Sequence, residues 1–289
     1  MNRRHMVCAA ALVTAACAGR GAPTPAPAPV HAGVPAQAAA PTEPTSLRYA
    51  AGTGHYRIES RQHIEQEMMG QTTKADITTA MRLTVAVADA AGNLGVGITV
   101  DSVDVTLPPG VPPEAGAALA AAKGTTLHLV ATPHGQTVSV TQPDSAPAAV
   151  RQLLQGLREF LPQLPQSSLA AGTTWSDTAT TTTSSQIGPT TVHSNRQYRV
   201  VGWEDRDGAR ALHLSLSATY TLSGSGEAQG QTIELAGGGQ RSAEVFVSAT
   251  GIYLGGMSSD SSLVNANVVS AGMLIPVRTT SHSTIARLP

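Results

Sequence analysis

Leu212-His-Leu-Ser-Leu-Ser-Ala-Thr-Tyr-Thr-Leu222 is the stretch that decides the fold class of this 289-residue chain. Its even positions are apolar, and every odd position between them is His, Ser or Thr. Alternation of period two places the two sets of side chains on opposite faces of a β-strand. The stretch therefore predicts a strand with one face toward an apolar interior and the other in water.

The same alternation recurs in residues 81–87 and 94–100, on either side of Asp89-Ala-Ala-Gly-Asn93. These segments predict an antiparallel hairpin over residues 77–105. The apolar phase shifts beyond Asp101, which predicts a β-bulge near Ser102. Further strands are predicted at residues 125–132, 136–141, 231–235, 243–249, 251–257 and 274–288.

Polar and glycine-rich stretches supply the remaining local predictions. The run of Thr and Ser over residues 173–185 has high β propensity but is polar on both faces, which predicts an edge strand. Gly224-Ser-Gly226 and Gly237-Gly-Gly239 lie between predicted strands and are interpreted as turns.

One helix is predicted over residues 145–161, because Val150, Leu153, Leu154, Leu157 and Leu161 follow helical spacing. A second helix, whose small side chains can bury little area, is predicted over residues 113–123. With the strands, these segments predict a mainly β fold with minor α: a strongly curved antiparallel sheet or half-barrel, with one or two helices packed on it.

Two similar segments, Tyr49-Ala-Ala-Gly-Thr53 and Leu169-Ala-Ala-Gly-Thr173, open the two halves of this region. Similar patterns follow each of them. We therefore predict a β domain over residues 47–289 that contains two pseudo-repeats, 47–141 and 167–260, joined by the helix at 145–161. The alternative is coincidence, because Ala, Gly and Thr are common in this chain.

The first residues predict export. Arg3 and Arg4 precede the apolar run Met6–Ala16, which is the layout of an export signal over residues 1–17. Thr14-Ala-Ala-Cys17 resembles the lipobox of bacterial lipoproteins, which implies acylation of Cys17; ordinary cleavage at Ala16-Cys17-Ala18 is the alternative. The Ala/Pro-rich segment 18–46 predicts a disordered tether.

Composition argues against a nucleic-acid partner, and the absence of known motifs argues against an enzyme. Charged residues make up 13% of the chain and Lys74 and Lys123 are its only lysines, so we expect no nucleic-acid partner. No nucleophile, phosphate-loop or metal-ligand motif is present, so we expect no catalytic residue, no metal and no cofactor. His63, Glu65 and Glu67 share one strand face, but a solvated, charge-alternating face explains them better than a metal site.

The segment Leu161-Pro-Gln-Leu-Pro to Gly172-Thr-Thr-Trp175-Ser-Asp177 resembles a group of uncharacterised bacterial envelope lipoproteins. The predicted architecture is also loosely similar to the lipoprotein carriers of the LolA and LppX kind, whose half-barrels hold acyl chains. These resemblances imply an exported, lipid-anchored protein of the cell envelope, at the outer membrane or periplasmic face if the cell is Gram-negative. They imply no activity.

We therefore expect a noncatalytic lipoprotein that binds a lipid or another hydrophobic ligand, with the helix acting as a lid. The membrane, through the acyl anchor, and an envelope protein are its other expected partners. The rival interpretation is a structural or protein-interaction module with a solid core, and an enzyme is third. The residues expected to line the ligand site are Leu83, Val85, Val87, Leu153, Leu154, Leu157, Leu212, Leu214 and Leu216.

Substituting Cys17→Ser should abolish acylation, because the thioether to the lipid requires the thiol. The variant should leave the membrane fraction and show no acyl mass in intact-protein mass spectrometry. A wild-type protein without an acyl mass, together with a variant that stays membrane-bound, would refute the lipid anchor.

Overall fold

The computed structural model describes residues 43–68, 70–108, 113–143, 146–184, 188–228 and 230–289. Cys17, the export signal and most of the predicted tether lie outside them. Of the last tether residues, Glu43 forms an ion pair with Arg210.

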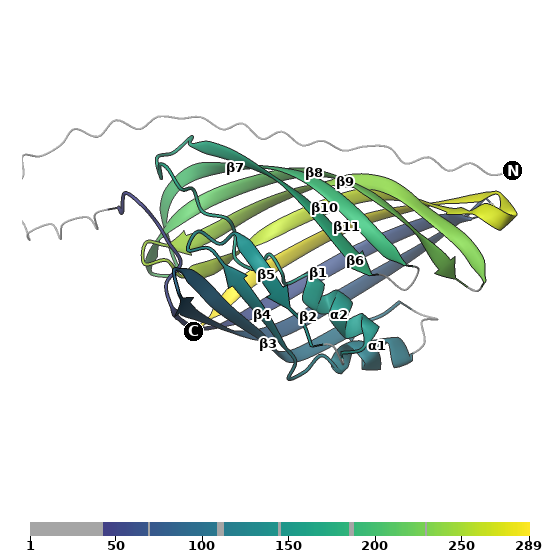
Figure 1. Cartoon of the computed structure of the whole chain (residues 1–289), viewed down its shortest axis with the longest axis horizontal. Helices are drawn as coiled ribbons and strands as arrows, with labels where there is room; N and C mark the ends of the chain where they lie inside the picture. Colours follow the sequence, from purple (N-terminus) through teal and green to yellow (C-terminus); the bar gives the residue numbers. More distant parts are fainter. Residues whose placement is uncertain (1–42, 69, 109–112, 144–145, 185–187, 229) are drawn as a thin grey trace, which may run out of the picture. The chain divides into compact units, whose positions relative to one another are not determined.

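One antiparallel sheet of eleven strands contains all the strands of the described region, in the order β5-β4-β3-β2-β1-β11-β10-β9-β8-β7-β6 (Figure 1). The sheet is curved but not closed, because its edge strands β5 and β6 do not pair with each other. This architecture confirms the predicted mainly β fold. The strands are β1 (Gly52–Met68), β2 (Gln71–Ala90), β3 (Asn93–Thr106), β4 (Thr126–Ala131), β5 (Thr137–Thr141), β6 (Thr174–Ser184), β7 (Pro189–Arg206), β8 (Ala209–Ala228), β9 (Gln231–Ser248), β10 (Tyr253–Val268) and β11 (Met273–Leu288).

The sheet consists of two up-and-down meanders, β1 to β5 and β6 to β11, and the pairing of β1 with β11 joins them. Strands β1 to β5 and β6 to β10 each follow chain order, and β1 and β6 both begin at or next to an Ala-Ala-Gly-Thr segment. Any meander has this order, so the internal duplication stays a prediction.

Two local predictions are confirmed. Arg82 pairs with Ser102 but Leu83 pairs with Val100, so Asp101 is the extra residue of a bulge in β3. The Thr-rich run forms β6, which is an edge strand of the sheet. Its hydroxyl side chains suit an edge because they leave both faces of the strand polar.

The interpretation of the two glycine segments as turns is wrong. β8 continues through Gly224 and Gly226, and β9 continues through Gly237, Gly238 and Gly239. A Cβ at Gly239 would lie 2.5 Å from the carbonyl oxygen of Ser261, and one at Gly237 would run into the carbonyl of Leu263. Here glycine permits a close approach of neighbouring strands rather than a reversal of the chain.

The predicted helix over 145–161 is shorter than expected. The helix α2 spans Ala148–Gln155, and the chain continues from Gly156 to Phe160 in tight turns whose amides donate to the carbonyl three residues earlier. Residues 156–169, which we call the strap, continue across the sheet. The second helix, α1, spans Pro113–Ala120 and packs beside β3.

The strap is fastened by aromatic and backbone contacts. The Phe160 ring meets Tyr56 and Tyr253 edge-on, with centroids 5.0 and 5.4 Å apart. The hydroxyl of Tyr49 donates to the carbonyl of Pro162 at 2.7 Å, and the amide of Leu164 donates to the carbonyl of His134 at 2.8 Å. The strap is therefore held to one face of the sheet, which we call the inner face.

The hydrophobic core lies between this part of the inner face and the covering segments. Val150 and Leu154 of α2 and Leu83 of β2 are fully buried in one cluster with Leu212 of β8. The curved sheet and α2 thus make a packed interior, to which both halves of the chain contribute residues.

Leu154→Ala should lower the free energy of unfolding by about 2–5 kcal/mol, because it removes a buried side chain and leaves a cavity. Denaturant unfolding measures this loss. Leu153→Ala on the same helix should cost less, because Leu153 is only partly buried. A cost near 1 kcal/mol for Leu154→Ala would instead indicate an open hollow beneath a lid.

Candidate functional site

The strand register divides the inner face into three zones along the strands. The first is the covered end, formed by the core cluster beneath α2 and the strap. The second zone, which we call the polar belt, crosses the middle of the sheet. Its residues are Asp177, Arg196, Arg241, Asp260, Ser281 and Gln62. Each is the Cα partner of the next on the neighbouring strand, except that Ala218 of β8 lies between Arg196 and Arg241. The third, the distal zone, is apolar and consists of Val192, Leu222, Ile233, Leu235, Val264, Ala266, Val268, Met273, Ile275 and Val277.

All nine side chains predicted to line a ligand site belong to the covered end or its border. Leu83, Leu154 and Leu212 are fully buried, and the structure brings strand and helix residues together as expected. Val87, Leu153 and Leu216 are only partly buried. Contact between any of the nine and a ligand stays a prediction, and the tight burial of this end favours packing.

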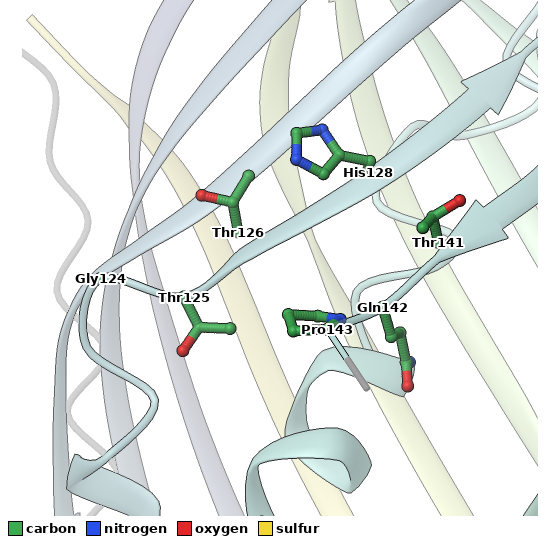
Figure 2. Close-up of a pocket in the computed structure, with 7 residues that line it drawn as sticks. All are labelled: Gly124, Thr125, Thr126, His128, Thr141, Gln142 and Pro143. Carbon is green, nitrogen blue, oxygen red and sulfur yellow. The ribbon is translucent and has the colours of Figure 1, made fainter. Parts of the chain in front are cut away.

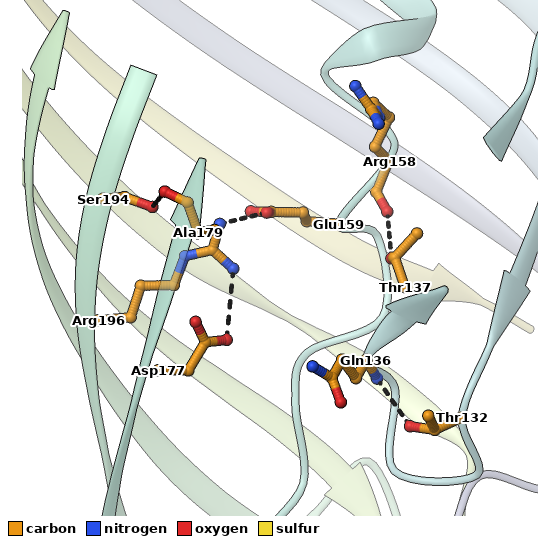
Figure 3. A network of polar contacts seen from close by, with 9 residues as sticks. All are labelled: Thr132, Gln136, Thr137, Arg158, Glu159, Asp177, Ala179, Ser194 and Arg196. Atoms are coloured by element: carbon orange, nitrogen blue, oxygen red, sulfur yellow. Dashed lines mark hydrogen bonds and ion pairs between the residues drawn. The ribbon is translucent and has the colours of Figure 1, made fainter. Parts of the chain in front are cut away.

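The polar belt is anchored at the β6 edge by Arg196, whose side chain is 17% exposed. Its guanidinium pairs with Glu159 of the strap and lies 4.0 Å from an Asp177 carboxylate oxygen. Figure 3 shows the Arg196 guanidinium between Glu159 and Asp177, with a dashed line to each. This network fastens the strap to β6 and β7 and neutralises the Arg196 charge.

A second contact crosses the belt at its centre. The ring of Tyr220 on β8 lies over Gly239 of β9, so that a Cβ at Gly239 would be 2.5 Å from the Tyr220 hydroxyl. That hydroxyl donates to Asp260 on β10 at 2.9 Å. Burial, reinforced by this hydrogen bond to a carboxylate, raises the pKa of Tyr220 to about 12. The bridge therefore spans three strands and depends on a glycine in the middle one.

Beyond the belt, the inner face becomes apolar again without belonging to the core. Leu222, Val264 and Val277 are half-buried, and none of the distal-zone residues belongs to the core cluster. Figure 1 shows the yellow hairpin of β10 and β11 projecting past both helices. On the opposite face the same strand segments carry mainly polar residues, which include Thr221, Ser223, Glu234, Asn265, Asn267 and Arg278.

Neither the distal zone nor the polar belt is apparent from the sequence alone. Alternation in residues 262–268 and the apolar pair Ile275 and Val277 were available signals. They show that one strand face is apolar, but only the register shows that these positions adjoin Leu222. Arg241 and Asp260 are likewise isolated charges in the sequence and become Cα partners only in the folded sheet.

On the outer face, His63 is held by carboxylates. Its ring nitrogens lie 2.7 Å from Asp76 and 3.4 Å from Glu65, and Glu65 also pairs with Lys74. The hydrogen bond to Asp76, followed by that to Glu65, raises the pKa of His63. Among the described residues, no three His, Cys, Asp or Glu side chains lie close enough together to hold a metal ion.

A second outer-face histidine, His213, lies between two glutamates. Its ring nitrogens are 3.3 Å from Glu204 and 2.6 Å from Glu244, and the ring stacks on Phe246. The Arg206 guanidinium lies 3.6 Å from the Phe246 ring centre. These contacts connect β7, β8 and β9, and they occupy the histidine with structural partners.

Two hollows are found on the outer face. One, of about 500 Å³, lies where β4 and β5 meet and is lined by Gly124, Thr125, Thr126, His128, Thr141, Gln142 and Pro143 (Figure 2). The other, of about 360 Å³, adjoins His63 and His282. Neither is lined by any of the nine predicted ligand residues.

The acids Asp101 and Asp104 of β3 have separate environments. Asp101 accepts a hydrogen bond from the Thr84 hydroxyl at 2.8 Å, whereas Asp104 is exposed opposite Ala80.

In the part of the chain that the structure describes, no helix is long and apolar enough to span a membrane.

No protein-family model matches the chain, and no curated protein matches it. Among solved structures, it is similar to a DUF1329 family protein from Desulfovibrio piger, with 8% identity over 82% of this chain and 84% of that one and a TM-score of 0.18. It is also similar to Pseudomonas aeruginosa OccK2 (OpdF) in complex with glucuronate, with 5% identity over 86% and 100% of the chains and a TM-score of 0.19. Similarities this low carry no functional argument.

Asp260→Asn should lower the pKa of Tyr220 from about 12 while leaving it above 10, because burial is the larger cause. Since the folded-state pKa is raised, the contribution of Tyr220 to stability is complete below about pH 10 and is lost as the pH rises through 12. Carbon-13 NMR titration of labelled tyrosines measures the pKa of Tyr220 in the wild type and in each variant. Asp104→Asn is the control, and an unchanged Tyr220 titration in Asp260→Asn would contradict the bridge.

Proposed function

We propose that the protein is a noncatalytic cell-envelope lipoprotein that holds a hydrophobic ligand on the distal zone of its inner face. The observation that carries this proposal is an apolar surface, half-buried except at the buried Val268, that lies outside the core cluster beneath the strap and α2. Large contiguous apolar surfaces on soluble domains commonly mark ligand or partner sites.

The lengths of the elements support this placement. β8 has 20 residues and is about 66 Å long, whereas the eight-residue α2 is about 12 Å long. The helix cannot cover more than a fraction of the strand. A bound acyl chain would remove apolar surface from water on both sides, which contributes about 0.8 kcal/mol for each buried methylene group.

The inner-face acids and bases support binding rather than chemistry. Arg196 is engaged by Glu159 and Asp177, and Asp260 accepts the Tyr220 hydrogen bond. A general acid or base needs a positioned partner and a suitable pKa, and a Tyr220 pKa of about 12 is unsuitable for proton transfer near neutrality. The leader and the lipobox-like segment at Cys17 support the envelope location and the anchor.

One observation favours a second candidate, a protein-interaction module. β6 is an 11-residue edge strand, and an edge of this kind can pair with an extended segment of another protein. The covered end would then serve as a rigid base for β6, fastened through Arg196 and Glu159. This function requires no ligand in the distal zone.

The test is binding of the neutral fluorescent probe N-phenyl-1-naphthylamine to the purified domain. We expect fluorescence enhancement with the wild type and its loss in Val264→Glu, because a charge in the distal zone opposes burial of an apolar ligand. Leu263→Glu, the adjacent half-buried residue on the outer face of the same strand, is the matched control and should leave binding unchanged.

Circular dichroism and denaturant unfolding establish that both variants are folded. Equal loss of binding in the two variants would place the probe elsewhere. Absence of probe binding by the wild type, together with absence of co-purifying lipid in native mass spectrometry of protein from its own host, would overturn the ligand-binding function in favour of the interaction module.

A further inference from the structure

Arg241 lies on the inner face where the polar belt meets the distal zone. Its neighbour toward the tip on the same face of β9 is Gly239, followed by Gly237, Leu235 and Ile233. Arg241 is exposed, and it forms no salt bridge with any residue that the structure describes. An accessible guanidinium therefore borders an apolar surface.

The other charges of the belt are engaged differently. Arg196 pairs with Glu159 and Asp177, and its side chain is 17% exposed. Asp260 is the Cα partner of Arg241 but accepts a hydrogen bond from Tyr220 instead. The Arg241 charge slightly offsets the rise in the pKa of both Tyr220 and Tyr253, which burial causes. Arg241 is thus the belt cation available to an anion.

The surface beyond Arg241 has the dimensions of a single hydrocarbon chain. Gly237 has no side chain, and its Cα partners on the flanking strands are Leu222 and Val264. Strands β8 and β10 are two strand spacings apart, or about 10 Å, so these side chains flank a strip one strand wide. From Gly237 to Ile233 the strip is four residues long, or about 13 Å, and the Tyr220 ring over Gly239 separates it from Arg241.

We infer that the ligand is a single-chain anionic amphiphile whose head group binds Arg241 and whose hydrocarbon chain lies along β9 between Leu222 and Val264. This inference rests on the proposed function and adds the charge and the orientation of the ligand. A guanidinium donates charge-assisted hydrogen bonds to carboxylate and to phosphate oxygens, so either group could serve as the head group. The apolar chain crosses the Tyr220 ring over Gly239 and makes its remaining contacts with the distal zone.

The experiment compares hexadecanoate with hexadecan-1-ol, added as monomers, as competitors of bound N-phenyl-1-naphthylamine. The two share a hydrocarbon chain and differ in head-group charge. We expect wild-type protein to bind hexadecanoate about tenfold more tightly than the alcohol, and Arg241→Gln to remove most of this difference while changing the affinity for the alcohol less than about twofold.

Two matched variants complete the design. Arg278→Gln removes an exposed arginine from the outer face of β11 and should preserve the preference for hexadecanoate. Arg241→Lys retains the positive charge and should restore part of the preference that Arg241→Gln loses. Raising the salt concentration should weaken binding of hexadecanoate in the wild type more than binding of the alcohol.

Equal affinity of the wild type for both competitors, or an equal loss of both in Arg241→Gln, would overturn the role of Arg241 while leaving the hydrophobic site intact. Failure of both competitors and of the neutral probe to bind the wild type would overturn the proposed function as well. Preference for lysophosphatidate over hexadecanoate that also depends on Arg241 would support the inference and assign the head group as phosphate.

Discussion

The strands of this protein are much longer than the segments that cover them, and this disparity governs the rest of the structure. Strands β7 to β11 have 16 to 20 residues, whereas the two α-helices have eight each and the 3-10 helix between β10 and β11 (Val269–Ala271) has three. A sheet must bury one face to be stable, but these helices supply only a short apolar surface. The inner face is consequently packed at one end and left without a helical cover toward the tips of β8 to β11.

The strap determines where the packed end stops. Phe160 packs edge-on against both Tyr56 and Tyr253, which stack on each other, and Glu159, the preceding residue, already pairs with Arg196 in the polar belt. One residue therefore contacts the core and its neighbour contacts the belt. Beyond this point the Tyr220 bridge over Gly239 replaces packing with a hydrogen bond to Asp260, and the apolar residues that follow have no described partner from the strap.

Alternation in the sequence was sufficient to predict the strands, the hairpin and its bulge at Asp101, since these depend on residues close in the chain. The glycine segments were misinterpreted because the same residue serves turns and close strand approaches, and only neighbouring backbones distinguish the two. The helix was predicted too long because Leu157 and Leu161 keep helical spacing within the strap, where both are buried without helical structure. The candidate site was missed because Leu222, Gly237 and Val264 meet only through the register of three strands.

The central claim is that the distal zone, and not the packed end, receives the ligand. The most direct measurement is intermolecular NOE spectroscopy between a bound hexadecanoate chain and carbon-13-labelled methyl groups of the protein. The account predicts NOEs from the methyl groups of Leu222, Val264 and Val277 to the chain, and none from Leu154 or Leu212. NOEs confined to Leu154 and Leu212 would contradict it, because the acyl chain would then lie beneath α2 in the covered end.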